Sequence, residues 1–186
     1  MTISRRLFML GAGGGVFAAS FSVPTARAGA QPVIVDMVGD QAGRWVGFDP
    51  IGLWVPAGTT IRWLLRSNVH SVAAYHPDND NHALRIPQDA APWASDVLIE
   101  PGEHFDVTLT VPGVYDYYCV PHEQAGMVGR IIVDEPTGPG ALGFDERPDL
   151  AGAADWEPVP EMARKAFPAV ADIMARKRIP FTRPKS

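Results

Sequence analysis

The chain has 186 residues, a formal net charge of −5 and a single cysteine. One cysteine excludes a disulfide framework within the chain, and the excess of negative charge argues against nucleic acid as a partner. The length is enough for one domain with extensions.

Residues 1–28 have the pattern of an export signal. Arg5 and Arg6 give a basic start, a Gly- and Ala-rich apolar run follows, and a small-residue cleavage site ends at Ala28. The paired arginines followed by Phe8 favour the twin-arginine route, with an ordinary secretory signal as the alternative. We therefore expect a periplasmic protein with its signal cleaved. The run is too short and glycine-rich to span a membrane comfortably, so no spanning segment is expected in the mature chain.

Short β-branched and aromatic runs punctuated by Gly and Pro follow, which indicates an all-β sandwich rather than a helical fold. We expect this domain to cover residues 29–134, with Trp54, Trp63 and Phe105 in its core. The expected strands lie at residues 33–38, 53–55, 60–65, 69–75, 105–111, 114–119 and 129–133.

Residues 76–100 form a long connection without a clear period. His76 and His82, together with Asp78 and Asp80, could form a second metal site. Clusters of Asp, Asn and Pro are also ordinary turn chemistry. We therefore favour a polar surface loop over a metal site here.

The strongest chemical signal is the spacing Cys119-x2-His122-x4-Met127. Thiolate, imidazole and thioether are soft ligands, and a blue-copper site needs one thiolate, two imidazoles and a weak axial thioether. His70 is the best candidate for the second imidazole. A cysteine nucleophile with a histidine base is the alternative, but such pairs normally meet from distant parts of the chain, and Met127 has no role in that chemistry. The pattern predicts one type 1 copper ion.

Two stretches carry a family resemblance. Residues 112–122 with 126–129 resemble the C-terminal half of the plastocyanin and pseudoazurin group of cupredoxins, and residues 48–63 resemble its first half. His70 matches the group's first copper histidine. The resemblance covers about residues 33–134 and implies a Greek-key cupredoxin β-sandwich. Ser71 departs from the pattern, because many relatives carry Asn there to pin the ligand loops together.

The resemblance implies a one-electron carrier whose copper is held by His70, Cys119, His122 and Met127. It also implies an electron port at the exposed edge of His122, with Tyr118 as a second, side-on route or a structural residue. The expected redox partners are a c-type cytochrome or a copper or haem oxidoreductase.

Two other classes of protein remain as alternatives, namely copper storage or delivery, and a docking subunit of a larger redox complex. Multicopper oxidases need His-x-His pairs, and none occurs here, which argues against oxidase chemistry within the chain. The chain is accordingly expected not to be an enzyme.

The remaining residues, 135–186, form a separate extension. After a Pro- and Gly-rich start, residues 161–178 show a helix-like pattern that Pro168 interrupts. Residues 161–186 hold seven Lys and Arg against two acidic residues, a net charge of +5, whereas residues 29–160 hold six against 19, a net charge of −13. Such a basic tail either binds a partner or packs as a helix against the sandwich, and we favour the packed helix.

Overall fold

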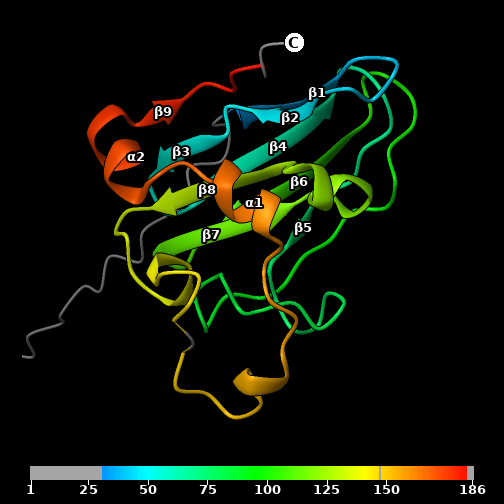
Figure 1. Cartoon of the computed structure of the whole chain (residues 1–186). Coiled ribbons are helices and arrows are strands. Elements are labelled where there is room, and N and C mark those ends of the chain that lie inside the picture. Colours follow the sequence, from blue (N-terminus) through cyan, green and yellow to red (C-terminus); the bar gives the residue numbers. More distant parts are fainter. Residues whose placement is uncertain (1–30, 147, 184–186) are drawn as a thin grey trace, which may run out of the picture.

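The computed structural model describes residues 31–146 and 148–183, and Figure 1 shows their arrangement. The predicted signal, residues 1–28, lies outside the described residues, so its cleavage and export route remain predictions. The expected limits of the cupredoxin domain, 29–134, and of the extension, 135–186, remain predictions as well.

The first sheet has the strand order β2-β1-β4-β6. Its two central strands alternate between buried and partly exposed residues, because one face meets the core and the other faces solvent. The inward positions include Val35 and Met37 on one strand and Ile61 and Trp63 on the other. The strands are β1 (Val33–Gly39), β2 (Val46–Asp49), β4 (Thr59–Leu65) and β6 (His104–Leu109).

The second sheet has the order β5-β7-β8-β3-β9 and packs against the first to form a β-sandwich. All six residues of β7 and of β8 are buried. Their outer face is closed by the C-terminal extension, which explains why neither strand alternates between apolar and polar residues. The strands are β3 (Gly52–Val55), β5 (Ala73–Ala74), β7 (Gly113–Tyr118), β8 (Val128–Val133) and β9 (Arg178–Ile179).

The predicted core aromatics divide between two environments. Trp63 is fully buried, and its ring centroid lies 5.3 Å from that of Tyr117 on the facing sheet. Phe105 is partly buried against this core. Trp54 is partly buried against a separate core cluster on the outer face of the second sheet, where its indole N–H donates to the Asp134 carbonyl (3.0 Å) and Lys177 covers its ring. A tryptophan with a polar tip suits this half-buried position.

The expected strand at residues 69–75 is reduced to β5, and His70 instead makes an isolated bridge with Leu98. The His70 N–H donates to the Leu98 carbonyl (3.2 Å), and the Leu98 N–H donates back (2.8 Å). The long connection of residues 76–100 is irregular, as expected. His70 therefore lies between β4 and β5, outside both sheets, because its backbone partner Leu98 belongs to that connection.

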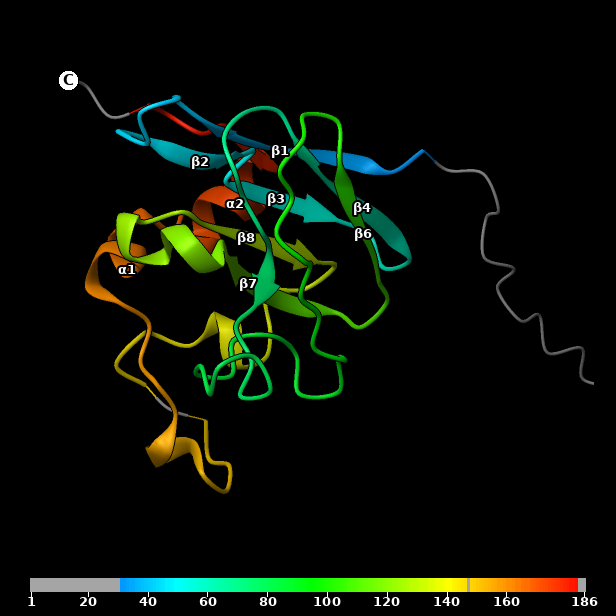
Figure 2. The same ribbon diagram turned by 90° about the vertical axis from the view of Figure 1, so that its right-hand side faces the viewer.

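The C-terminal extension leaves β8, runs outward in a long loop and returns to the sandwich, as Figures 1 and 2 show. Pro168 separates its two helices as predicted, and both helices pack against the sandwich, which confirms the favoured interpretation. Within residues 31–146 and 148–183, none of the helices has the length and apolarity needed to cross a membrane. The elements of the extension are η2 (Pro139–Ala141), η3 (Ala153–Asp155), α1 (Glu161–Ala166) and α2 (Val170–Arg176).

A buried charge cluster joins the sandwich to this extension. Asp116 on β7 is fully buried and accepts hydrogen bonds from Arg130 (2.7 and 2.9 Å) and Arg85 (2.7 Å). Arg85 also donates to the carbonyls of Gly140 and Leu142. The other hydrogen-bonding groups of the arginines therefore hold the extension's backbone in place.

Candidate metal centre

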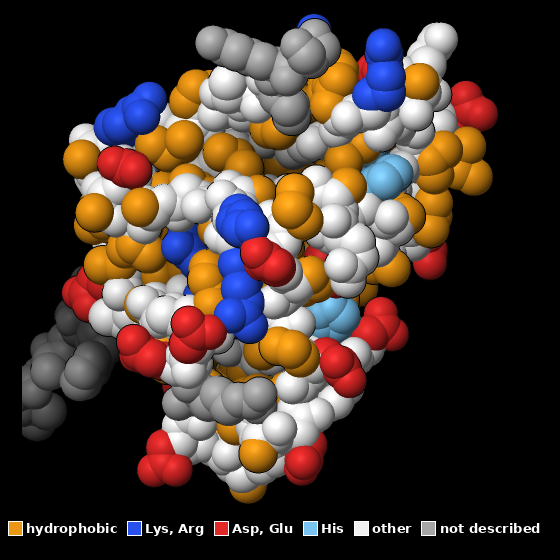
Figure 3. Space-filling view, viewed as in Figure 1, with side chains coloured by type: hydrophobic (Ala, Val, Ile, Leu, Met, Phe, Trp, Pro, Cys, Tyr) orange, Lys and Arg blue, Asp and Glu red, His pale blue; other side chains and the backbone are white. Residues whose placement is uncertain are grey.

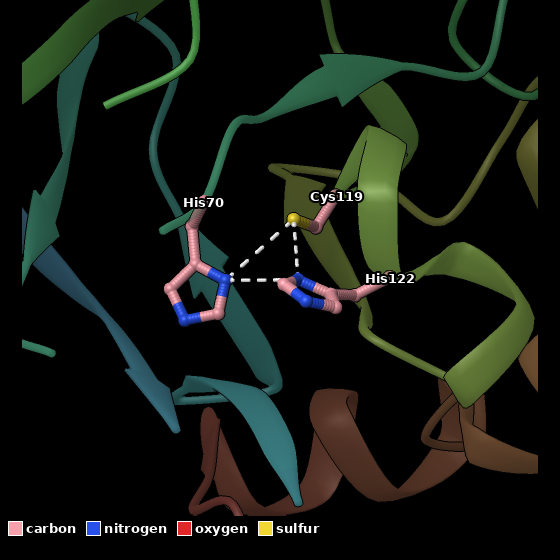
Figure 4. Close-up of side chains that lie close together, drawn as sticks. All are labelled: His70, Cys119 and His122. Carbon is pink, nitrogen blue, oxygen red and sulfur yellow. Dashed lines mark hydrogen bonds between the residues drawn. The ribbon is translucent and has the colours of Figure 1, made fainter. Parts of the chain in front are cut away.

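Three side chains of the predicted copper site converge at one end of the sandwich, as Figure 4 shows. His70 comes from the connection after β4, Cys119 from the end of β7, and His122 from the short helix η1 (Val120–Ala125). The two Nδ1 atoms lie 3.2 Å apart, and the Cys119 Sγ lies 3.7 Å from Nδ1 of His70 and 3.4 Å from Nδ1 of His122. Within the described part of the chain, no other group of three His, Cys, Asp or Glu side chains is placed to hold a metal ion.

The chemistry of these three donors fits a copper ion. One sulfur and two imidazole nitrogens face a common point, and soft sulfur ligands with imidazole favour copper over calcium or magnesium. His70 and Cys119 are fully buried, whereas His122 is partly exposed. A metal here is thus shielded from water except near His122.

Burial sets the protonation of the three groups without a metal. Burial and the neighbouring His122 lower the pKa of His70 to about 4, and burial also lowers the pKa of His122. Both imidazoles are therefore neutral at neutral pH and can donate a lone pair to a metal. Burial raises the pKa of the Cys119 thiol to about 11, although hydrogen bonds from Ser71 oppose the shift. Metal binding must accordingly displace the thiol proton.

Ser71 connects the two segments that carry these residues. Its backbone N–H points at the Cys119 Sγ (3.4 Å), and its Oγ accepts a hydrogen bond from the Val120 N–H (3.1 Å). Ser71 is itself buried. Although Ser71 departs from the expected pattern, it links the His70 segment to the Cys119 loop through both its backbone and its side chain.

The ligand loop closes on itself below Cys119. The Cys119 N–H donates to the Met127 carbonyl (3.0 Å), and the Met127 N–H donates to the His122 carbonyl (3.1 Å). Gly126 ends η1 with a φ of 82°, a left-handed conformation that glycine adopts without strain. Met127 is fully buried in the core cluster that contains Cys119. Its role as the axial ligand stays a prediction.

Glu123 is a further residue of this loop, which the sequence reasoning missed. Its carboxylate accepts a hydrogen bond from the Tyr75 hydroxyl (2.6 Å) and contacts Nε2 of His82 (3.1 Å). The side chain is buried, so these contacts anchor the ligand loop to the connection that follows β5. No local signal in the sequence marks this anchor, because its two partners lie 48 and 41 positions earlier.

The same contacts bear on the alternative second metal site. Nδ1 of His82 lies 3.0 Å from the Asn79 carbonyl, so both of its ring nitrogens are engaged. His76 instead lies beside Asp78, at 3.7 Å. These histidines do not converge, and a polar loop describes the segment better than a metal site.

Tyr118 is enclosed rather than exposed. Its ring stacks on His82, with centroids 4.5 Å apart and planes at 15°, and also contacts Tyr75. The side chain is 1% exposed. Tyr118 therefore does not itself reach the surface, whereas His122 does.

The sequence matches known copper proteins over the region that carries this site. Residues 35–134 match the family model of copper binding proteins of the plastocyanin/azurin family. Over 106 residues the chain is 40% identical to a chloroplastic plastocyanin of Hordeum vulgare, covering 53% of this chain and 61% of that protein. Over 133 residues it is 35% identical to a chloroplastic plastocyanin of Oryza sativa subsp. indica, covering 67% and 79%.

A solved structure supports the fold. The chain resembles pseudoazurin from Methylobacterium extorquens with a TM-score of 0.50 and 24% identity, over 73% of this chain and 92% of that one. This likeness concerns the sandwich architecture, and the chain spans only about three fifths of the barley relative's length.

Proposed function

Because the chain belongs to the plastocyanin/azurin family, in the plastocyanin and pseudoazurin group of cupredoxins, and its cofactor is copper, we propose that it is a one-electron carrier. In this proposal a single type 1 copper ion is held by His70, Cys119, His122 and Met127. The observation that carries it is the convergence of one cysteine sulfur and two Nδ1 atoms within 3.7 Å of one another.

The surrounding contacts suit electron transfer, since a carrier works fastest when its ligands barely move between Cu(I) and Cu(II). The His70 backbone is fixed by two hydrogen bonds to Leu98. Ser71 and Glu123 fix the ligand loop from two sides. Ligands that are locked by such supporting contacts keep one geometry, which keeps the reorganisation between the two oxidation states small.

Electrons are proposed to enter and leave at the exposed edge of His122. Val120, Pro121 and Ala125 are exposed around it and make a mainly apolar rim. A partner protein can come close to the imidazole there without displacing charged groups. The buried Tyr118 makes a direct second port less suitable.

The proposed partners are a c-type cytochrome or a copper or haem oxidoreductase, and the chain itself is proposed to catalyse no reaction. Copper storage or delivery is the main alternative. A buried thiolate ligand disfavours it, because such a site releases metal slowly. The other alternative, a docking subunit of a larger redox complex, is compatible with electron transfer. In that case the extension would be the part that binds the complex.

The location is proposed to be periplasmic, after export on residues 1–28. Replacing Arg5 and Arg6 together with Lys should leave unprocessed precursor in the cytoplasm, because the twin-arginine route reads the paired arginines. Cell fractionation measures the distribution, with Arg27→Lys as a control that keeps the pair. Normal export of the double variant would point to the general secretory route instead.

Met127 is proposed to be the axial ligand, and two substitutions of similar size test it. Met127→Gln should lower the reduction potential, because an amide oxygen is harder than a thioether and favours Cu(II). Met127→Leu removes the donor and should raise the potential. Redox titration of each copper-loaded variant measures the shift. Met37→Leu, which replaces a buried methionine of β1, is the control for packing; shifts no larger than this control would exclude axial ligation.

A further inference from the structure

The C-terminal extension builds an apolar groove against the ligand loop. The groove has a volume of about 440 Å³ and is lined by the end of η1, by α1, by residues 179–182 and by Val46 and Ile51. Its lining contains one cation, Lys165, and no Asp or Glu. In Figure 3 apolar side chains gather between α1 and the C-terminal segment, with Lys and Arg side chains around them. The groove is therefore mainly apolar, and one of its sides is the loop that carries His122.

Met162 of α1 marks the open side of this groove. Its side chain is 54% exposed, although Ala163 beside it is fully buried. α1 sits directly over the ligand loop, and the Met162 carbonyl lies close above Gly126. An exposed methionine offers a flexible apolar contact that adapts to different partners.

Four cations among the described residues of the extension lie outside every ion pair. Arg176, Lys177, Arg178 and Arg183 are exposed, and none has a carboxylate within 4.0 Å among residues 31–146 and 148–183. Lys177 and Arg183 instead lie over the rings of Trp54 and Trp45, at 4.1 and 4.4 Å. Arg178 and Arg183 are chain neighbours of the groove-lining residues 179–182.

Other contacts also hold the extension in place. Ile173 is fully buried against the outer face of the sheet, and Arg130 donates to the Pro168 carbonyl (3.1 Å). The Phe181 N–H donates to Asp49 (3.1 Å). Apolar burial and backbone hydrogen bonds therefore dock the extension. Its last part, residues 161–186, has a net charge of +5 on a chain whose residues 29–160 carry −13.

We propose that this groove and its cations form a docking surface for an acidic segment of a redox partner. An apolar side chain of the partner fills the groove, and its carboxylates meet Arg178, Arg183 and their neighbours. Charge complementarity selects this partner, because residues 29–160, with a net charge of −13, repel an acidic protein, while residues 161–186, with a net charge of +5, attract it and set its orientation. The inference rests on the proposed electron transfer and adds the chemistry of the partner. Docking here brings the partner against Ala125 and Gly126, a few residues from His122.

The test uses the copper-loaded mature chain, reduced to diamagnetic Cu(I) and labelled with nitrogen-15. It is titrated at low salt with a short peptide of glutamates around one phenylalanine, and separately with the matching lysine peptide. We expect the acidic peptide alone to shift the amide signals of Gly126, Met162, Ile179, Phe181 and Thr182, and salt to reverse the shifts. Shifts spread evenly over the surface, or equal shifts with the lysine peptide, would overturn the proposal.

Two variants of equal charge change make the test specific. Arg178→Gln with Arg183→Gln should weaken peptide binding about three- to tenfold, because two charge contacts are lost. Arg62→Gln with Arg66→Gln removes two cations that pair with Asp106 and Asp36, outside the extension and the groove lining, and should change binding less than about twofold. If both double variants weakened peptide binding equally, the net charge of the protein would explain the binding. That result would contradict a specific docking surface on the extension.

The same samples test two other possible occupants of the groove, a membrane surface and a second copy of this chain. Stronger binding to phosphatidylglycerol vesicles than to the acidic peptide would replace the protein partner by a membrane. Concentration-dependent dimerisation in sedimentation experiments, abolished by the Arg178 and Arg183 substitutions, would identify a second copy instead. The visible spectrum of each oxidised, copper-loaded sample is recorded before its reduction. Absence of the copper band speaks against the proposed function, whereas lost peptide binding with an intact band speaks only against this surface.

Discussion

Replacing Asp116 with Ala should lower the free energy of unfolding by about 3–5 kcal/mol. The substitution leaves two buried guanidinium groups, Arg85 and Arg130, without their carboxylate, and the side chains of all three residues are at most 7% exposed. Uncompensated buried charge is among the most costly defects in a protein interior. Chemical denaturation, followed by circular dichroism, measures the loss.

A matched control exists on the surface of the first sheet. Asp106 also receives two hydrogen bonds from one arginine, Arg62 (2.8 and 2.7 Å), but both side chains are about one third exposed. Asp106→Ala should therefore cost about 1 kcal/mol or less. Equal losses in the two variants would contradict the claim that burial makes the Asp116 cluster decisive. The Asp116 variant should also be cleaved more readily by protease in the extension, since Arg85 and Arg130 hold its backbone.

Cys119→Ser should abolish the intense visible absorption of the oxidised, copper-loaded protein. That absorption requires a thiolate bound to Cu(II), and Cys119 is the only cysteine of the chain. A serine hydroxyl is a harder donor that holds its proton more tightly, so copper affinity should fall as well. Absorption spectra and competition with a chelator measure the two effects.

Tyr118→Phe is the control for this variant. The Tyr118 hydroxyl is buried and has no hydrogen-bond partner in the described structure, so its removal should disturb little. The neighbouring substitution should keep the visible band and the copper content. A strong band that persists in Cys119→Ser would show that another group binds the metal.

The sequence predicted correctly those features that depend on residues close together in the chain. The alternation in residues 33–38 and 60–65 predicted two strands with one buried face, and β1 and β4 confirm them. The spacing of Cys119 and His122 within a turn predicted that both face one point, and their Sγ and Nδ1 atoms lie 3.4 Å apart. The third ligand, His70, is an isolated histidine in the connection after β4. Only its chemistry and the family resemblance marked it as a candidate.

Contacts between distant segments set the rest. The strand expected at residues 69–75 is cut short because His70 pairs with Leu98 in an irregular connection that has no period to read. Glu123 gave no signal, because its partners Tyr75 and His82 lie in or beside that connection. The sequence predicted the break between the two helices at Pro168. It did not predict how the extension docks, because Arg130 and Asp116, which help to hold it, lie far from Pro168 in the chain.

The central claim is that one copper ion, bound through Cys119, exchanges one electron. The most direct test is a reductive titration of the copper-loaded mature chain, with copper content and the visible band followed together. We expect one copper per chain, complete bleaching of the band by one electron, and full recovery on reoxidation. A copper-loaded protein that stays colourless after oxidation, or that does not regain its band, would contradict electron transfer and favour copper storage or delivery.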